Sequence, residues 1–244
     1  QESDTGSITL GDIDVLTQPS RVREILGYLP QDFGVYPKVT AADMLDHLAV
    51  LKGLVKKGER KEAVEALLHQ TNLWNARDRK LGTFSGGMRQ RFGIAQALVG
   101  SPGLVIVDEP TAGLDPAERM RFLNLLAEIG ESVVVILSTH IVEDVSDLCS
   151  RMAVLDRGRL LYDGSPRDAI ASLEGKVWTR TVDRADLPVV QAEHQVLSTH
   201  LAAGRTVVHV KSDARPGPEY DPVTADLKDV YFTVLGDGAA AEAA

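Results

Sequence analysis

The sequence predicts an α/β fold built around a parallel sheet, and two stretches carry that prediction. The apolar run Leu104–Asp108 has the composition of a fully buried parallel strand and ends abruptly in the acids Asp108 and Glu109. Upstream, Ser85 and two glycines stand immediately before an amphipathic run, the pattern of a capped helix with free N-terminal amides. Helix N-termini and the carboxyl edges of parallel strands are both places where phosphate groups bind.

Composition is that of an ordinary globular protein and excludes several classes. The 244 residues are 44% hydrophobic and 25% charged, so a substantial core is expected. The net charge of −9 disfavours nucleic acid as a partner, because a phosphate-backbone binder needs a concentrated basic surface. The single Cys149 excludes an internal disulfide. No apolar run approaches the roughly 18–20 residues that span a bilayer, so we expect membrane association to come through a partner.

The first hundred residues predict one strand and then a helical region. Residues 25–29 are a short buried strand, and Pro30 begins a loop that contains Gln31 and continues to Pro37. Thr40 with Asp43 caps the next helix, and a further helix is expected over 59–70. With the helix after Ser85, these segments predict a helical subdomain over about 35–100.

The residues after the two acids continue the α/β pattern. Asp115 is a helix N-cap, with Pro116 at the first helical position and Glu118 completing a capping-box-like pattern. A second buried strand over 132–137 is followed by His140. We therefore expect His140 on the same sheet edge as the acids, where it could hydrogen-bond a phosphate, although such a histidine taken alone is more often structural.

The pattern changes again near Gly175. A hairpin around Arg157-Gly158 and a helix capped at Ser165 precede it. Beyond it, alternating stretches at 176–182, 195–201 and 206–211 suggest a small sheet, and an amphipathic helix follows. We expect one domain over 1–175, a small α+β domain over 176–235, and a disordered tail over 236–244.

Taken together, the motifs resemble those of the ATP-binding subunits of ABC transporters. Phe84–Met88 corresponds to the signature motif, Leu104–Asp108 to the Walker B strand and Leu114-Asp115 to the D-loop. The signature departs from its commonest Leu-Ser-Gly-Gly-Gln form at Phe84 and Met88, which leaves the phosphate-contacting positions intact. The order of the motifs makes the resemblance specific, over roughly residues 6–175.

The resemblance implies a role for each candidate residue toward ATP and Mg²⁺. It assigns catalysis to Glu109, as the base that polarises water, and to His140, as the switch histidine at the γ-phosphate. Metal binding falls to Asp108 with Gln31, the Q-loop glutamine. Nucleotide contacts are implied for the remaining candidates, which are Gln31, Ser85, Gly86, Gly87 and Asp115.

One expected motif is missing from the sequence. No G-x-x-x-x-G-K-[ST] phosphate loop occurs, and segment 6–13 resembles a part of the family's domain that lies downstream of that loop. We therefore expect a partial P-loop NTPase core, truncated at its N-terminus, that is inactive alone because most phosphate contacts come from the loop.

The function implied is ATP hydrolysis coupled to transport, more specifically export. The implied partners are transmembrane permease subunits, which dock near 33–37, and a second ATP-binding subunit in a head-to-tail dimer at the cytoplasmic face of the membrane. The small C-terminal domain resembles the accessory domain of some drug and antibiotic exporters. Two alternatives stay open: a non-transport ABC ATPase, and a non-catalytic regulatory or binding module.

Overall fold

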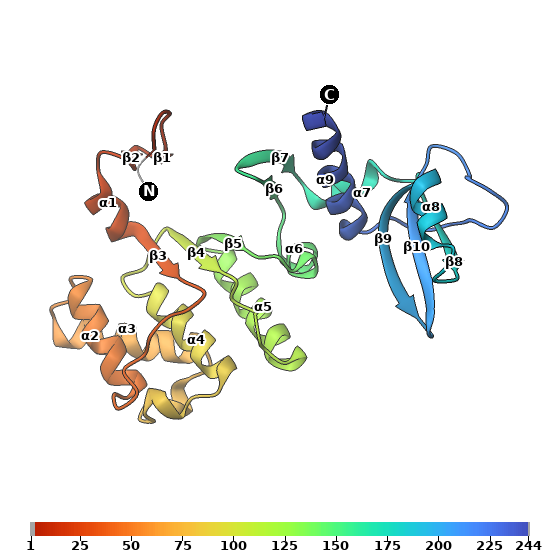
Figure 1. The fold of residues 1–244 in the computed structure, drawn as a ribbon. Helices are drawn as coiled ribbons and strands as arrows, with labels where there is room; N and C mark the ends of the chain where they lie inside the picture. Colours follow the sequence, from red (N-terminus) through yellow and green to blue (C-terminus); the bar gives the residue numbers. More distant parts are fainter. Residues whose placement is uncertain (1–2, 244) are drawn as a thin grey trace. The chain divides into compact units, whose positions relative to one another are not determined.

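A computed structural model describes residues 3–243, with side chains described as far as Asp237. The chain divides into two compact units, Gln1–His140 and Ile141–Ala244. Figure 1 traces both, coloured along the sequence.

The first unit is built on a three-stranded parallel sheet in the order β3-β4-β5. The strands are β3 (Leu26–Leu29), β4 (Leu104–Asp108) and β5 (Val134–Ser138). The connection from β3 to β4 contains α2 (Ala41–Leu51), α3 (Lys57–Gln70) and α4 (Gly86–Ala97), with two short 3₁₀ turns, and α5 (Pro116–Gly130) connects β4 to β5. Ahead of the sheet lie β1 (Thr9–Leu10), β2 (Ile13–Asp14) and α1 (Pro19–Ile25), a helix that the sequence analysis missed.

Helices α2, α3 and α4 share an apolar core of their own. Leu45, Leu68 and Phe92, one from each helix, are 1% exposed or less and belong to one cluster. The predicted cap of α2 is confirmed, because the Thr40 hydroxyl accepts a hydrogen bond from the Asp43 amide at 3.2 Å. Local capping therefore starts α2 where the sequence predicts, and shared burial holds the three helices together.

The two faces of the parallel sheet differ sharply in exposure. Val105 and Val107 are fully buried on the face against which α4 and α5 pack. On the opposite face, Tyr28 is 54%, Val134 64% and Ile136 50% exposed, and Tyr28 and Ile136 flank Ile106 across the sheet. Strand side chains alternate between faces, so one apolar face of this sheet is largely exposed within the first unit, with Ile106 partly buried between its neighbours.

The second unit contains a four-stranded antiparallel sheet in the order β11-β8-β10-β9. Its strands are β8 (Val177–Val182), β9 (Gln195–Ala202), β10 (Arg205–Lys211) and β11 (Asp221–Pro222). Two helices pack on it, α8 (Leu187–Glu193) and α9 (Leu227–Ala243). The unit begins with α6 (Val142–Leu148), the hairpin β6 (Met152–Asp156) and β7 (Arg159–Gly164), and α7 (Pro166–Ala171).

The centre of strand β10 packs against α8 on one face and α9 on the other, and its histidine, His209, contacts an aspartate of α9. Val208 and Val210 are fully buried in a cluster that includes Val190 of α8. His209 lies between them and therefore points to the other face, where its Nδ1 lies 2.9 Å from Asp229 Oδ1 of α9. Asp229 and Asp226 also bond each other's amides, which caps α9. The pair thus fastens the start of α9 to the sheet.

Two features differ from the predicted domain limits. Residues on both sides of Gly175, among them Leu173 and Val177, belong to one buried cluster with Leu227 of α9, so shared burial joins the segments that the sequence pattern separates. Helix α9 runs to Ala243 through most of the segment predicted as disordered, which is consistent with the high helix propensity of its alanines. Ala244 lies outside the described residues.

The His209–Asp229 pair predicts a pH-dependent stability. The hydrogen bond that the His209 ring donates to Asp229 raises the pKa of His209 above its ordinary value of 6.5, against the opposing effect of burial. The charges of Asp229 and Asp226 act in the same raising direction, and His200 of β9 is the other titratable ring beside it, at 5.7 Å. Because the folded-state pKa is the higher one, this stabilisation is complete below pH 6.5 and is lost as the pH rises through the raised pKa.

The measurement is urea unfolding of the chain and of His209→Gln across this pH range. The stability difference between them should shrink steadily as the pH rises. His47→Gln is a suitable control, because His47 has no hydrogen-bond or ion-pair partner among the described side chains. A difference for His209→Gln that stays constant with pH would show that the protonated pair does not stabilise the fold.

Candidate functional site

The first group of candidate residues lies at the carboxyl edge of the parallel sheet. Strands β4 and β5 pair so that Asp108 faces Ser138, and the Glu109 amide donates to the Ser138 carbonyl at 2.8 Å. Glu109 has a φ of 46°, a left-handed conformation that is uncommon for a residue other than glycine. The chain therefore leaves β4 in a tight turn, and Glu109, the first residue after the strand, stays hydrogen-bonded to β5.

This turn brings Glu109 beside His140. His140 Nδ1 lies 2.7 Å from Glu109 Oε2, although that buried oxygen accepts no well-directed hydrogen bond. The Glu109 side chain is 17% exposed, whereas that of His140 is 74% exposed. A shielded carboxylate with an unused lone pair, next to an accessible imidazole, can take a proton from a bound water while the imidazole contacts a third group. We call Asp108, Glu109 and His140 the edge group.

Gln31 reaches the same edge from the third strand. It follows β3 by two residues, and β3 pairs in parallel with β4 so that Leu29 faces Val107. Among the described residues, Gln31 makes no hydrogen bond to either acid, and its side chain is exposed. The loop that contains Gln31 is anchored at Phe33, whose ring lies against Gly93 of α4. A Cβ atom at Gly93 would come within 2.7 Å of that ring. The glycine thus permits the close approach of this loop to α4.

The edge group suits a magnesium ion that is shared with a nucleotide rather than enclosed by protein. No three His, Cys, Asp or Glu side chains gather as a metal site within the described part of the chain. Mg²⁺ keeps several waters and is commonly held by one or two carboxylates plus substrate phosphates. Asp108 at the strand end, with Gln31 on the same edge, fits that donor set.

The second group of candidates lies at the start of α4. The Ser85 hydroxyl accepts a hydrogen bond from the Met88 amide at 3.2 Å, which confirms the predicted N-cap. Gly86 and Gly87 form the first turn. A Cβ at Gly86 would meet nothing closer than Leu114 Cδ2 at 4.0 Å, so the space beside this residue is open.

Gly87 is different, because a carboxylate occupies the space beside it. A Cβ there would lie 2.1 Å from Glu118 Oε2. Glu118 is held in place by Arg91 at 2.5 Å and Arg121 at 2.6 Å, and its side chain is only 18% exposed. Its amide donates to Asp115 Oδ1 at 2.9 Å, which caps α5. The contact with Arg91 fastens α5 to α4. We call Ser85, Gly86, Gly87, Asp115 and Glu118 the signature group.

The structure thus places the predicted site residues other than Gln31 in two groups, and it adds two contacts that the sequence analysis missed. The sequence analysis anticipated Glu118 as a capping residue of α5, but not as the partner of Gly87 and Arg91. Arg91 lies in the second turn of α4, beside the buried Phe92, and a charged residue within this apolar run was the available signal. Two residues 27 positions apart cannot be paired without knowing how α4 and α5 pack.

Comparisons with known proteins agree with the motifs. A sequence model of the ABC transporter family matches residues 1–112. The chain is 33% identical to the daunorubicin resistance ATP-binding protein DrrA2 of Streptomyces coeruleorubidus, over 98% of the chain and 73% of that protein. It is 28% identical to the ABC transporter ATP-binding protein YxlF of Bacillus subtilis, over 94% and 82% of the two lengths. To the linearmycin resistance protein LnrL of B. subtilis it is 34% identical, over 70% of the chain and 55% of LnrL.

The chain therefore belongs to the family of ABC transporter ATP-binding proteins. Members of this family bind ATP, normally with Mg²⁺, and hydrolyse it. The relatives include proteins of drug resistance and of Nod factor export. No helix in the described residues has the length and apolar character needed to cross a membrane.

The Gly87–Glu118 contact predicts strong non-additivity. Gly87→Ala should destabilise the fold because its methyl group displaces a carboxylate held by two arginines. In a Glu118→Ala background the same change should become neutral or stabilising, since alanine is the better helix former. We expect a coupling free energy of about 1–2 kcal/mol in a double-mutant cycle measured by chemical unfolding.

Gly86→Ala is the matched control, because it lies in the same helical turn but has open space beside it. Its effect should be the same in both backgrounds. If the effects of Gly87→Ala and Glu118→Ala on the free energy of unfolding are additive, the Glu118 carboxylate can move away from residue 87 without loss of stability.

Proposed function

We propose that this chain is the ATP-binding subunit of an ABC exporter, in which ATP hydrolysis drives transport through separate permease subunits. The observation that carries the proposal is the edge group, in which a shielded Glu109 lies beside an exposed His140 at the end of two parallel strands. The resistance and export functions in the names of several relatives favour export.

In this proposal the residues divide the work of phosphoryl transfer. Glu109 orients and deprotonates the attacking water, His140 hydrogen-bonds the γ-phosphate, and Asp108 with Gln31 holds the metal. Bound Mg²⁺ would neutralise charge on the phosphate oxygens. Ser85, Gly86 and Gly87 present the N-terminus of the signature helix to the nucleotide of a second ATP-binding subunit, and Asp115 of the D-loop contacts nucleotide at the same interface. The protein works at the cytoplasmic face, held there by its permease partner near 33–37.

The phosphate loop would have to come from a segment outside these 244 residues. The uncovered apolar face of β3-β4-β5, with Tyr28, Val134 and Ile136, supports this part of the proposal because an exposed surface of this kind favours association. We propose that the segment with the phosphate loop covers that face. The 244-residue chain would then be inactive alone, with the small C-terminal region serving as an accessory domain.

A non-catalytic binding or regulatory role is the competing proposal, and the missing phosphate loop favours it. The two proposals differ in whether nucleotide binding can be restored. Calorimetric titration of the chain with Mg-ATP should show no micromolar binding. A separately supplied N-terminal segment of the family, with its phosphate loop, should raise the melting temperature and permit ATP binding.

A segment whose phosphate-loop lysine is replaced by alanine separates the two effects. It should still raise the melting temperature, because it still covers the apolar face, but it should not restore ATP binding. If the intact segment stabilises the chain without nucleotide binding, the regulatory role is the better account.

The role of Glu109 has its own test in the chain combined with that segment. Glu109→Gln should bind ATP normally and lower turnover by at least about 100-fold, the usual size of general-base effects. Glu128→Gln, an exposed acid on α5, should hydrolyse ATP at the unsubstituted rate. Comparable steady-state rates in the two variants would remove Glu109 from the mechanism.

A further inference from the structure

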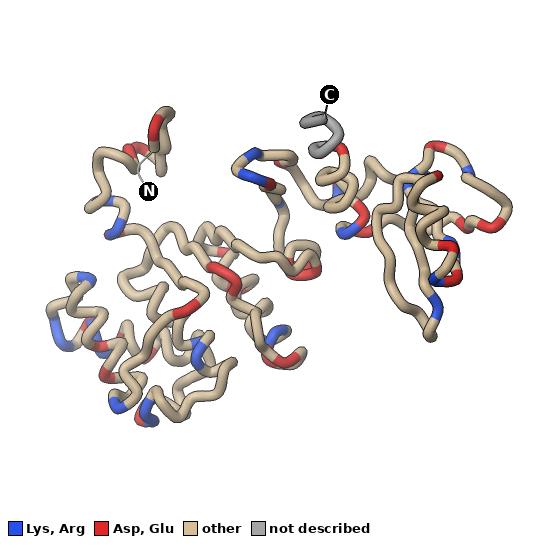
Figure 2. The backbone as a smooth tube through the Cα atoms, viewed as in Figure 1, with Lys and Arg blue, Asp and Glu red and all other residues tan. Residues whose placement is uncertain are grey.

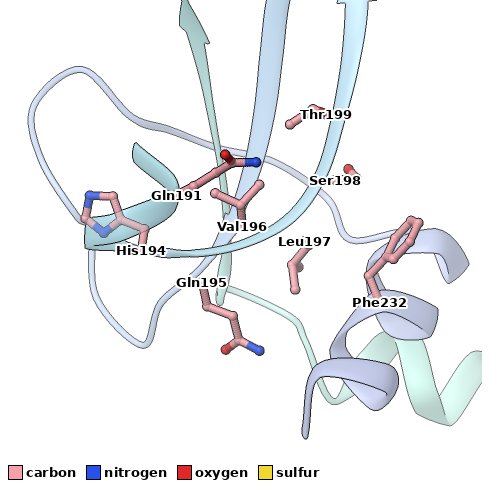
Figure 3. A pocket seen from close by; sticks show the side chains of 8 residues that line it. All are labelled: Gln191, His194, Gln195, Val196, Leu197, Ser198, Thr199 and Phe232. Atoms are coloured by element: carbon pink, nitrogen blue, oxygen red, sulfur yellow. The ribbon is translucent and has the colours of Figure 1, made fainter. Parts of the chain in front are cut away.

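Strand β9 forms a free edge of the antiparallel sheet. It pairs with β10 alone in the described part of the chain, at one end of the order β11-β8-β10-β9. A groove of about 540 Å³ lies along its first half. Figure 3 shows this groove lined by residues 194–199, by Gln191 of α8 and by Phe232 of α9. Backbone groups on the outer side of an edge strand can pair with another strand.

The strand lacks the charged residues and prolines that usually protect such an edge, and its second half is exposed. Its eight residues include no Lys, Arg, Asp, Glu or Pro, and Figure 2 shows the strand without charged positions from end to end. Residues 199–202 are all exposed, and Leu201 is 76% exposed. Edge strands that stay single are commonly blunted by charge, proline or a covering segment, so this edge is suited to adding a strand.

We propose that β9 pairs antiparallel with β9 of a second copy of this chain. The absence of charge decides the kind of partner: an acidic or basic peptide finds no complementary group along β9. Two copies, each with a net charge of −9, can meet here without bringing like charges together along the strand. Pairing of β9 with β9 of another copy is also an isologous contact: both copies use the same surface, so the chain needs no second, complementary surface.

Antiparallel pairing of identical strands restricts the geometry. The two-fold axis that relates the two copies is perpendicular to the sheet and keeps each side chain on its own face. It must therefore pass where one residue faces its own copy, because facing residues lie on the same face. The middle of β9 places that residue at Ser198, Thr199 or His200. In this arrangement Leu201, which lies on the same face as Thr199 because they face alternate residues of β10, is covered by the first half of the other β9.

The test is a series of single cysteines along β9 in the full chain, with the native Cys149 replaced by serine. A residue that faces its own copy has a Cα separation of about 4.5–5.5 Å, within the range that a disulfide bridges. Mild oxidation should therefore give one dominant position among Ser198→Cys, Thr199→Cys and His200→Cys. Cross-linking no greater than that of Val189→Cys, an exposed position on α8 outside the groove, would overturn the proposal.

Sedimentation velocity of the unmodified chain, without nucleotide, provides a second test that is independent of the ATP site. Thr199→Lys should weaken dimerisation by at least about tenfold, because an axis at Thr199 or at either neighbouring residue places the two lysines opposite or diagonally next to each other. Val189→Lys, which adds the same charge away from the edge, should dimerise like the parent chain. A monomer at all concentrations, or equal effects of the two lysines, would exclude a second copy as the partner of β9.

Discussion

The parallel pairing of β4 with β5 is the constraint on which the candidate site depends. Parallel strands end at the same edge, so the register that sets Asp108 opposite Ser138 also brings the next residues of both strands together. The amide of Glu109 remains bonded to β5, and its left-handed backbone turns the side chain toward His140. A slip of one residue in either strand would separate the acid from the histidine, because it would turn one of the two side chains to the other face of the sheet.

A second constraint joins the signature helix to the D-loop helix. The Glu118 carboxylate fills the space that Gly87 leaves open, and two arginines fix it there. The two glycines of the signature therefore serve different ends: Gly86 leaves an open approach to the helix N-terminus, whereas Gly87 accommodates an internal contact. Of the two arginines, Arg91 lies on α4 and is 13% exposed, so its contact with Glu118 favours movement of α4 and α5 as one body.

The second unit is organised by a strand that packs on both sides. Valines on one face of β10 contact the α8 side, while His209 on the other face bonds the capped start of α9. Strand β9, uncharged and partly exposed, is the longer of the two edge strands that the described chain leaves with a partner on one side alone.

The sequence by itself determined the elements whose signals are local. The buried strand before Asp108, the caps at Thr40, Ser85 and Asp115 and the turn at Arg157 follow from residues within a few positions of each other. Short helices such as α1, α6 and α8 were missed because seven residues hold too little periodic pattern. Only the tertiary structure decided that Glu118 fills the space at Gly87, that Glu109 lies 2.7 Å from His140, and that the segments on either side of Gly175 share one core. Such contacts join positions far apart in the chain, and their geometry depends on how whole elements pack, which no local pattern encodes.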